Sequence, residues 1–322
     1  MMDMENKVFL ETRNLKKYFK VRKGMVHAVD DVDMQILHGK TMGVVGESGC
    51  GKSTLGRTIL NILPPTSGEV LFDGEDITKY NAKQMKEFKS RAQIIFQDPY
   101  SSVSPRMTVA EAIAEPLIVA GMYKNRAERE KRVTELMDTA GLASRVYNAY
   151  PHELDGGRLQ RVGIARALAL NPKFIVCDEP VSALDVSIQA QILNLLMDLQ
   201  DEMGLSYMFI THDLSVVKHI SDDIMVMYLG KCVERAPTEE LFANPTHPYT
   251  KALLSAIPVP KLSMRDKKPT LIKGEITSPI DPPPGCRFAA RCPYKTDACV
   301  QSYPEAVEVS KGHFVSCVLF KK

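Results

Sequence analysis

The stretch GESGCGKST combines residue types and a spacing suited to binding phosphate. It matches G-x-x-x-x-G-K-[ST] at every fixed position and lies between an apolar run, 41–45, and a helix-like run, 55–63. Glycines let the backbone wrap a phosphate, and successive N–H groups at a helix start attract an anion. A lysine then supplies positive charge and a hydroxyl reaches Mg²⁺. The predicted site residues are Gly46, Glu47, Ser48, Gly49, Cys50, Gly51, Lys52, Ser53 and Thr54.

Further polar residues come directly after apolar, strand-like runs. FIVCDEP ends in Asp178, which is suited to holding Mg²⁺, and Glu179, which is suited to polarising an attacking water. Gln97 follows RAQIIF and His212 follows YMFIT, where an amide reaches Mg²⁺ or water and an imidazole reaches a phosphate. Each residue taken alone is more often structural. Their order along a chain with a phosphate loop favours the functional interpretation.

A second glycine-containing stretch, HELDGGRLQR, precedes a helical pattern. Gly156 and Gly157 place backbone N–H groups at a helix start, which suits an anion. Asp155 equally suits the N-cap position of that helix, which is a purely structural role. Composition does not separate the two interpretations, and both stay open.

Alternating strands and helices must position these groups. Short alternating runs over 7–45 predict strands, and apolar spacings of three and four over 108–142 and 188–203 predict helices. Strands alternating with helices around a phosphate loop predict an α/β core with a mainly parallel sheet. The other predicted elements are strands at 69–72 (followed by a turn at 73–74), 92–96, 174–177, 205–211 and 224–228, and a helix at 163–170.

The order of these motifs resembles that of the ATP-binding subunits of ABC transporters, over residues 7 to about 235. The matching motifs are the Walker A loop GESGCGKST, the Q-loop residue Gln97, the signature LDGGR, the Walker B run IVCDEP, the D-loop SALD and the switch residue His212. Phe19 in LKKYF resembles the aromatic residue that stacks on adenine, and Tyr18 is its competitor.

The resemblance implies an ABC-type P-loop nucleotide-binding domain at 1–235. This domain has a RecA-like core, an antiparallel β subdomain and a helical subdomain at about 98–170. The cofactors implied are ATP and Mg²⁺, with Ser53, Gln97 and Asp178 near the metal. Glu179 is the implied catalytic base and His212 the γ-phosphate contact. Each ATP is expected between one subunit's Walker A loop and the signature loop of the facing subunit in a head-to-tail dimer.

The signature departs from the family pattern LSGGQ at two positions, Asp155 and Arg158. The serine hydroxyl of the family pattern donates to the γ-phosphate, whereas an ionised carboxylate cannot donate and repels phosphate. Arg158 offers a compensating positive charge. The hypothesis is that the site completed by this loop has altered hydrolysis, or that Asp155 points away as a helix cap.

The segment 236–322 is rich in proline, which predicts a separate, loop-rich C-terminal region. NPTHPYTKALLSAIP and PPPGCRFAARCPY resemble the C-terminal extension of oligopeptide and dipeptide importer ATPases, especially the second ATPase of heterodimeric pairs. Membership implies import of peptides, or of nickel or another small solute. The implied partners are a paralogous ATPase subunit, two transmembrane permeases near Asp98 to Arg106 and, indirectly, an extracytoplasmic peptide-binding protein.

This C-terminal region also contains Cys286, Cys292, Cys299 and Cys317. Four thiolates in a short segment suit a metal site that would staple a region too small for its own core. Zinc sites usually show C-x2-C pairs, and their absence favours a [4Fe–4S] cluster. Some members of the importer family carry such a cluster. Zinc and free thiols are the alternatives.

Bulk composition excludes several classes. The net charge of +2 gives no signal for nucleic acid, and no run approaches the length of a transmembrane helix. The N-terminus is too polar for a secretory signal, so the expected location is the cytoplasmic face of the membrane, reached through permeases. There are two alternatives: a soluble ABC ATPase acting on nucleic acid or ribosomes, and a subunit that binds ATP without hydrolysing it. The sequence does not identify the transported substrate.

Overall fold

The computed structural model describes residues 7–257, 274 and 277–320. The prolines at 258, 260 and 269, which contributed to the prediction of a loop-rich C-terminal region, lie outside the described residues. Contacts divide the chain into two compact units. Among described residues, unit 1 contains 7, 37–40 and 79–210, and unit 2 contains 8–36, 41–78, 211–257, 274 and 277–320.

Unit 1 contains three parallel strands, β6 (Ala92–Ile95), β7 (Phe174–Asp178) and β8 (Ser206–Ile210). Every residue of β7 and β8 is buried, as expected for parallel strands covered on both faces. The register places Cys177 opposite Ile95 on one side and Phe209 on the other. The carboxyl ends of these strands therefore lie along one edge.

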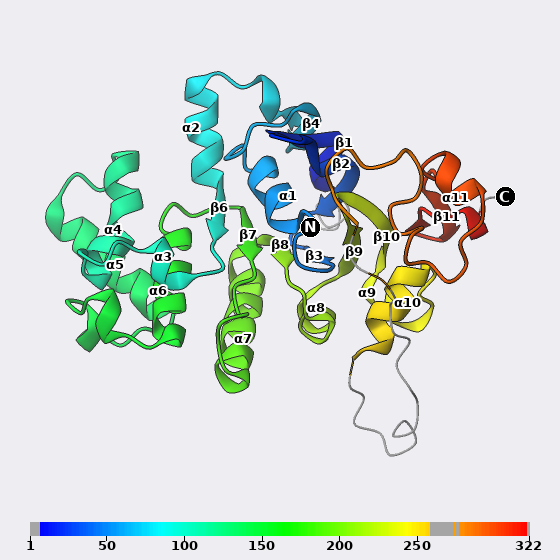
Figure 1. The fold of residues 1–322 in the computed structure, drawn as a ribbon. Coiled ribbons are helices and arrows are strands. Elements are labelled where there is room, and N and C mark those ends of the chain that lie inside the picture. Colours follow the sequence, from blue (N-terminus) through cyan, green and yellow to red (C-terminus); the bar gives the residue numbers. More distant parts are fainter. Residues whose placement is uncertain (1–6, 258–273, 275–276, 321–322) are drawn as a thin grey trace, which may run out of the picture. The chain divides into compact units, whose positions relative to one another are not determined.

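The helices of unit 1 are amphipathic, with caps at several of their ends. A capping box between Thr108 and Glu111 starts α4, which packs on α5 and α6 (Figure 1). Helix α7 buries one stripe of leucine and isoleucine side chains. The bounds are α2 (Ala82–Arg91), α3 (Pro99–Ser102), α4 (Val109–Ala120), α5 (Arg126–Thr139), α6 (Gly156–Leu168), α7 (Val186–Met203), η2 (Ser144–Val146) and η3 (Pro151–Glu153).

Unit 2 contains an antiparallel sheet with the strand order β2-β1-β4-β5. Its β4–β5 hairpin turns at Asp73 and Gly74, both with positive φ, as an Asp-Gly pair at a two-residue hairpin turn favours. The strands are β1 (Val8–Val21), β2 (Gly24–Leu37), β4 (Ser67–Phe72) and β5 (Glu75–Asp76), followed by η1 (Ile77–Lys79).

Unit 2 also contains β3, which pairs in parallel with β9, followed by β10, β12 and β11 in antiparallel order. The C-terminal strands thus continue a sheet begun near the phosphate loop. The strands are β3 (Thr41–Val45), β9 (Asp223–Tyr228), β10 (Lys231–Pro237), β11 (Val307–Ser310) and β12 (His313–Val315). The helices are α1 (Lys52–Ile59), α8 (Leu214–Ile220), α9 (Thr238–Ala243), α10 (Pro248–Ser255), α11 (Ala298–Gln301) and η5 (Val318–Phe320).

The elements predicted from the sequence pattern are confirmed in type. The helix expected over 55–63 ends early, because Asn61 adopts a positive φ of 50°. The strongly polar α2 and the short strands β11 and β12 were not predicted. The boundary expected at 235/236 stays a prediction. Among the described residues, no helix has the length and apolarity needed to cross a membrane.

Candidate functional site

The phosphate-binding loop joins β3 to α1 in a conformation that requires glycine at two positions. Gly46 has φ of 151°, and a Cβ there would lie 2.2 Å from the Met227 carbonyl oxygen. Gly51 has φ of 106°, and a Cβ there would lie 2.0 Å from the Ala28 carbonyl oxygen. Any larger residue would strain the backbone and clash with main chain. The sequence spacing therefore encodes this backbone path.

Lys52 turns back over the loop. Its Nζ lies 2.8 Å from the Gly46 carbonyl oxygen and 3.1 Å from that of Glu47, and the side chain is buried. Gly51 is the N-cap of α1 and supplies no side-chain cap. The N–H groups at the start of α1 are thus not occupied by a capping side chain, which is the arrangement that binds phosphate.

Near the carboxyl end of β7, the predicted catalytic base Glu179 meets Gln97, a predicted contact of nucleotide and Mg²⁺ in unit 1. The Gln97 amide Nε2 donates to the Glu179 carboxylate Oε2 at 3.0 Å. Asp178 is the last residue of β7 and is buried. Glu179 has a positive φ of 49°, and its N–H donates to Ile210 O at 3.0 Å. A strained, non-glycine backbone at a strand end is typical of functional sites.

The D-loop, residues 182–185, leads into α7, and its last residue, Asp185, is the N-cap of that helix. The Asp185 carboxylate accepts from Ile188 N at 3.0 Å and from the Ser187 hydroxyl at 2.8 Å. The bond from the Ile188 N–H, followed by that from Ser187, lowers the pKa of Asp185 below its usual value of 3.8.

The signature loop places Asp155 as the N-cap of α6. Its Oδ1 accepts from Arg158 N at 2.8 Å, and its Oδ2 lies 3.5 Å from Arg158 Nε. Gly156 is the first residue of α6 and Gly157 is buried. The capping geometry left open in the sequence is therefore present in the structure.

The remaining predicted nucleotide contacts belong to unit 2. His212 is exposed and directly precedes Asp213, the N-cap of α8. Tyr18 stacks on His27 with ring centroids 4.0 Å apart and donates its hydroxyl to Asp30. Phe19 is half-buried beside Lys17, whose Nζ lies 5.1 Å from the ring centroid.

The four C-terminal cysteines line one small cavity with His247 and Phe288. None of the seven cysteines forms a disulfide. Burial raises the pKa of the Cys286 thiol to about 11 and also raises the pKa values of Cys292 and Cys317. Within the described residues, no group of three or more His, Cys, Asp or Glu side chains is arranged to hold a metal ion.

Several residues that the sequence pattern does not single out join the cysteine segment to other parts of unit 2. Arg287 donates to Leu229 O and to the Asp30 carboxylate, and Arg291 pairs with Glu47. Burial works to raise the pKa of Asp30, but Tyr18, Lys231 and Arg287 together lower it. The arginines flank cysteines in CRFAARC, a visible signal, but the sequence does not give their distant partners.

A cavity of about 1160 Å³ lies within unit 1. Residues of α2, β6, α4 and α6 line it together with Ser102, which falls inside the stretch 98–106 that was predicted to contact permeases. Its lining includes cations of α2 and α6 as well as apolar side chains of α4, including Lys83, Lys86, Arg166, Pro116 and Val119.

Family comparisons match both parts of the chain. The family described as "ABC transporter" matches residues 29–182, and the "Oligopeptide/dipeptide transporter, C-terminal region" matches residues 233–299. The oligopeptide transport ATP-binding protein OppF of Salmonella typhimurium is 50% identical over 98% of this chain and 97% of its own length. AppF of Bacillus subtilis, with the same description, is 49% identical over 97% of each chain.

Solved structures agree with these matches. The ATP-binding cassette MJ0796, in a dimeric post-hydrolysis state with ADP and Pi, has a TM-score of 0.65 and 31% identity, covering 71% of this chain and 98% of that one. The cbiO1 protein of Clostridium perfringens, part of an ABC transporter complex, has a TM-score of 0.66 and 29% identity, covering 74% and 92%. Together with the near full-length relatives, these findings show that the chain belongs to the family of ATP-binding subunits of oligopeptide ABC transporters.

Proposed function

We propose that this protein is the ATP-hydrolysing motor of an importer for di- or oligopeptides. The observation that supports this most directly is the phosphate loop. Its two glycines with positive φ and the helix start without a side-chain cap suit the binding of an anion. The Gln97–Glu179 pair supplies the residues for hydrolysis. The C-terminal match to oligopeptide and dipeptide transporters supports the peptide substrate class.

Each polar group has a role in this proposal. Lys52 contacts the β- and γ-phosphates, while Ser53, Gln97 and Asp178 hold Mg²⁺ directly or through water. Glu179 is the general base for the attacking water, and Gln97 orients its carboxylate. His212 contacts the γ-phosphate. The remaining residues of the loop, Gly46, Glu47, Ser48, Gly49, Cys50, Gly51 and Thr54, surround the phosphates.

Adenine stacks on Phe19 in this proposal. His27 covers one face of the Tyr18 ring, and Asp30 accepts its hydroxyl hydrogen, so Tyr18 already has partners. The contact described above for Phe19 is with the Lys17 cation, and no ring stacks on Phe19 among those contacts. Phe19 is therefore the better candidate for stacking on adenine.

The motor acts as a head-to-tail dimer with a paralogous ATPase subunit. The signature residues Asp155, Gly156 and Gly157 face the nucleotide bound by the partner. Of the two permeases, one docks on the cavity of unit 1, where cations and apolar side chains suit a short amphipathic helix of a permease. The protein thereby sits on the cytoplasmic face of the membrane, and a peptide-binding protein outside the cell delivers substrate.

We also propose that the four C-terminal cysteines hold a [4Fe–4S] cluster. Four soft sulfur donors line the same small cavity, and they are the donor set that an all-thiolate cluster uses. A single zinc ion requires sulfur atoms about 3.8 Å apart, since each Zn–S bond is about 2.3 Å and the geometry is tetrahedral. The four cysteines contain no C-x2-C pair of the kind usual in zinc sites, and this spacing favours the larger cluster over zinc. The group would cross-link a segment that has little core of its own.

Turnover by the complete transporter tests the motor role. Glu179→Gln should lower the rate of ATP hydrolysis roughly 10²- to 10⁴-fold, because it removes the general base, while MgATP affinity stays within a few-fold. Glu202→Gln, on the exposed end of α7, is the matched control and should leave the rate unchanged. Hydrolysis at an undiminished rate in Glu179→Gln would contradict the assignment.

Iron, sulfide and zinc content of anaerobically purified protein tests the cluster. About four irons and four sulfides per chain should be found, lost in Cys292→Ser and kept in Cys232→Ser. A single zinc without iron would replace the cluster with a structural zinc site. No metal at all would leave four free thiols.

A second candidate function has a specific observation behind it. Asp155 presents a carboxylate, not a hydroxyl, at the start of α6, so the site that this loop completes would hydrolyse ATP slowly. The chain would then be an ATP-binding subunit whose partner's site is nearly inactive. Asp155→Ser in the assembled transporter decides between the two, as described in the Discussion.

A further inference from the structure

The cysteine segment reaches the phosphate-binding loop through Arg291. Its guanidinium contacts both oxygens of the Glu47 carboxylate, at 2.7 and 3.0 Å, and the Tyr228 hydroxyl at 3.3 Å. The Arg291 side chain is only 7% exposed and that of Glu47 23% exposed. A two-bond arginine–carboxylate pair of this kind fixes the orientation of both groups, and lysine cannot reproduce it.

The main chain of Glu47 is held from the same side. Its N–H donates to the Tyr249 hydroxyl at 2.9 Å, and Tyr249 is completely buried in α10. The second residue of the phosphate loop is thus fixed at both its backbone and its carboxylate. Both partners come from the part of the chain after residue 236.

Aromatic packing keeps these partners in place. The ring of Phe288, three residues before Arg291, lies 5.3 Å from the rings of both Tyr228 and Tyr249, centroid to centroid. Tyr228 and Tyr249 are themselves 4.8 Å apart. Such contacts between buried rings favour one arrangement of the segment.

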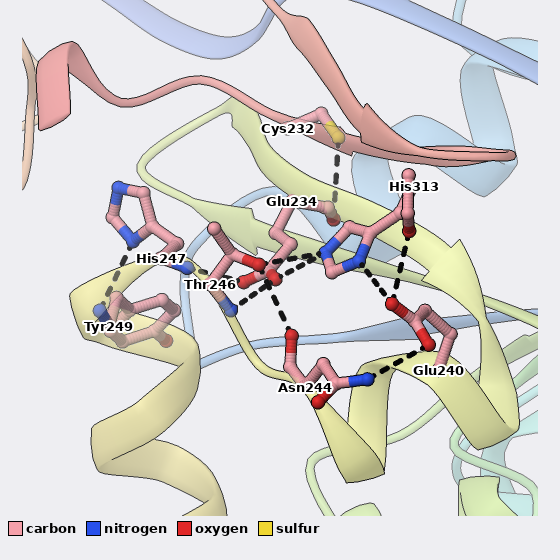
Figure 2. Close-up of polar contacts among 9 residues, drawn as sticks. Cys232, Glu234, Glu240, Asn244, Thr246, His247, Tyr249 and His313 are labelled. Atoms are coloured by element: carbon pink, nitrogen blue, oxygen red, sulfur yellow. Dashed lines mark hydrogen bonds and ion pairs between the residues drawn. The ribbon is translucent and has the colours of Figure 1, made fainter. Parts of the chain in front are cut away.

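A buried polar network fixes the start of α10, where Tyr249 lies (Figure 2). The Glu234 carboxylate accepts from the N–H groups of Thr246 at 2.7 Å and His247 at 2.9 Å. The imidazole of His247 then accepts from Tyr249 N at 3.1 Å. His313, on β12, lies 2.8 Å from Glu234, so the C-terminal strand is tied to the same carboxylate. A fully bonded buried network of this kind is rigid.

Charge gives the Arg291 contact a second role. Glu47 carries a carboxylate in a loop whose proposed ligand is a polyphosphate, and like charges at this range repel. Pairing with a buried arginine neutralises the carboxylate and fixes its position. Without the arginine, the loop would present an unpaired negative charge beside its own ligand site.

We propose that Arg291 is a positioning residue for ATP, through which the C-terminal cysteine segment holds and neutralises Glu47 of the phosphate loop. The cysteine segment is then part of the nucleotide site and not only an appendage. This inference rests on the proposed assignment of residues 46–54 as the ATP-phosphate site. It predicts that the segment controls the affinity for ATP and leaves the chemical step unchanged.

The test is ATP hydrolysis by the complete transporter at varied ATP concentration. Arg291→Ala should raise KM for ATP roughly tenfold and leave kcat within twofold. The reason is that the variant weakens the binding of ATP, whereas the loop is correctly placed once ATP is bound. Arg291→Lys should be intermediate, because it keeps the charge but not the two-bond geometry. Lys295→Ala, an exposed cation of the same segment, is the control and should leave both constants unchanged.

A double variant separates positioning from simple destabilisation. Glu47→Gln combined with Arg291→Ala should lower KM toward the wild-type value, because it removes the unpaired carboxylate. An unchanged KM in Arg291→Ala, whether or not kcat falls, would overturn the proposal. So would a double variant whose KM equals the product of the two single effects.

Two further variants keep the outcome decisive. If Arg291→Ala does not fold, Tyr249→Phe removes only the hydroxyl that holds Glu47 N and should raise KM several-fold; an unchanged KM there overturns the proposal. Lys52→Ala reports on the underlying assignment. If Lys52→Ala strongly weakens ATP binding and Arg291→Ala has no effect, the inference fails alone. If Lys52→Ala has no effect, the assignment of the phosphate site fails.

Discussion

Two helices of this protein start at glycine-containing motifs, and the two starts differ in what occupies their N–H groups. Helix α1 begins after Gly51, which has no side chain to offer as a cap. Helix α6 begins after Asp155, whose carboxylate accepts the N–H of Arg158. Both starts carry the partial positive charge of a helix N-terminus. In α1 that charge is open to a phosphate, whereas in α6 a fixed carboxylate already balances it.

The difference teaches that a glycine-rich helix start is not sufficient for an anion site. At α1, Lys52 adds a buried positive charge directly behind the glycines. At α6, Arg158 is engaged with Asp155 at 3.5 Å. We therefore expect tight phosphate binding at α1 and, in a dimer, only a completing contact at α6.

The largest expected effect is the loss of MgATP affinity when the cation at the start of α1 is removed, compared with the same change at the start of α6. Lys52→Ala should weaken MgATP binding to the purified chain roughly 100-fold, since a charged hydrogen bond to phosphate contributes about 1.5–3 kcal/mol. Arg158→Ala, the matched change at α6, should alter affinity less than twofold. Titration calorimetry of both variants measures the two constants. Equal losses in both would mean that the two helix starts do not differ as described.

A smaller effect is expected from making the α6 cap neutral. Asp155→Ser keeps an N-cap but removes the charge that repels a facing phosphate, so hydrolysis by the assembled transporter should rise about 3- to 10-fold. Asp155→Ala is the control for the cap itself and should cost about 1 kcal/mol of stability. An unchanged ATPase rate and nucleotide affinity in Asp155→Ser would show that Asp155 serves only as a cap.

The smallest effect concerns Asp185, which caps α7 as Asp155 caps α6. Since the folded pKa of Asp185 lies below its unfolded value, its contribution to stability is present above about pH 4 and is lost as pH falls through the folded pKa. Asp185→Asn caps equally well but does not titrate. Urea unfolding of both proteins should therefore show a small wild-type advantage in stability at pH 6 that disappears by pH 3. A difference that does not change with pH would contradict the ionic role of this cap.

The parts of the fold that depend on local pattern could be predicted. The apolar runs of β7 and β8 and the spacing in α7 were sufficient for their elements. Helix α2 could not be predicted, because its sequence AKQMKEFKSR buries only Phe88 and gives almost no apolar period. Strands β11 and β12 are short, and they form because β10 offers an edge, which no local pattern shows.

The candidate site also has parts that the sequence could predict and parts that it could not. Glycine spacing and residue order were sufficient to predict roles for the phosphate loop, Gln97 and Glu179, because each motif lies within a few consecutive residues. The pairing of Arg291 with Glu47 spans 244 residues and follows from packing alone. The role of Asp155 was undecided in the sequence because a cap and an anion contact use the same helix start, and only the geometry shows the cap.

The most direct test of the whole account is ATP-driven uptake of a labelled peptide into vesicles that contain the complete transporter and its peptide-binding protein. We expect uptake with the wild-type chain that stops in Glu179→Gln, although that variant still binds MgATP. Wild-type vesicles that hydrolyse ATP without accumulating any peptide, or uptake that persists in Glu179→Gln, would contradict the conclusion that this chain is the motor of a peptide importer.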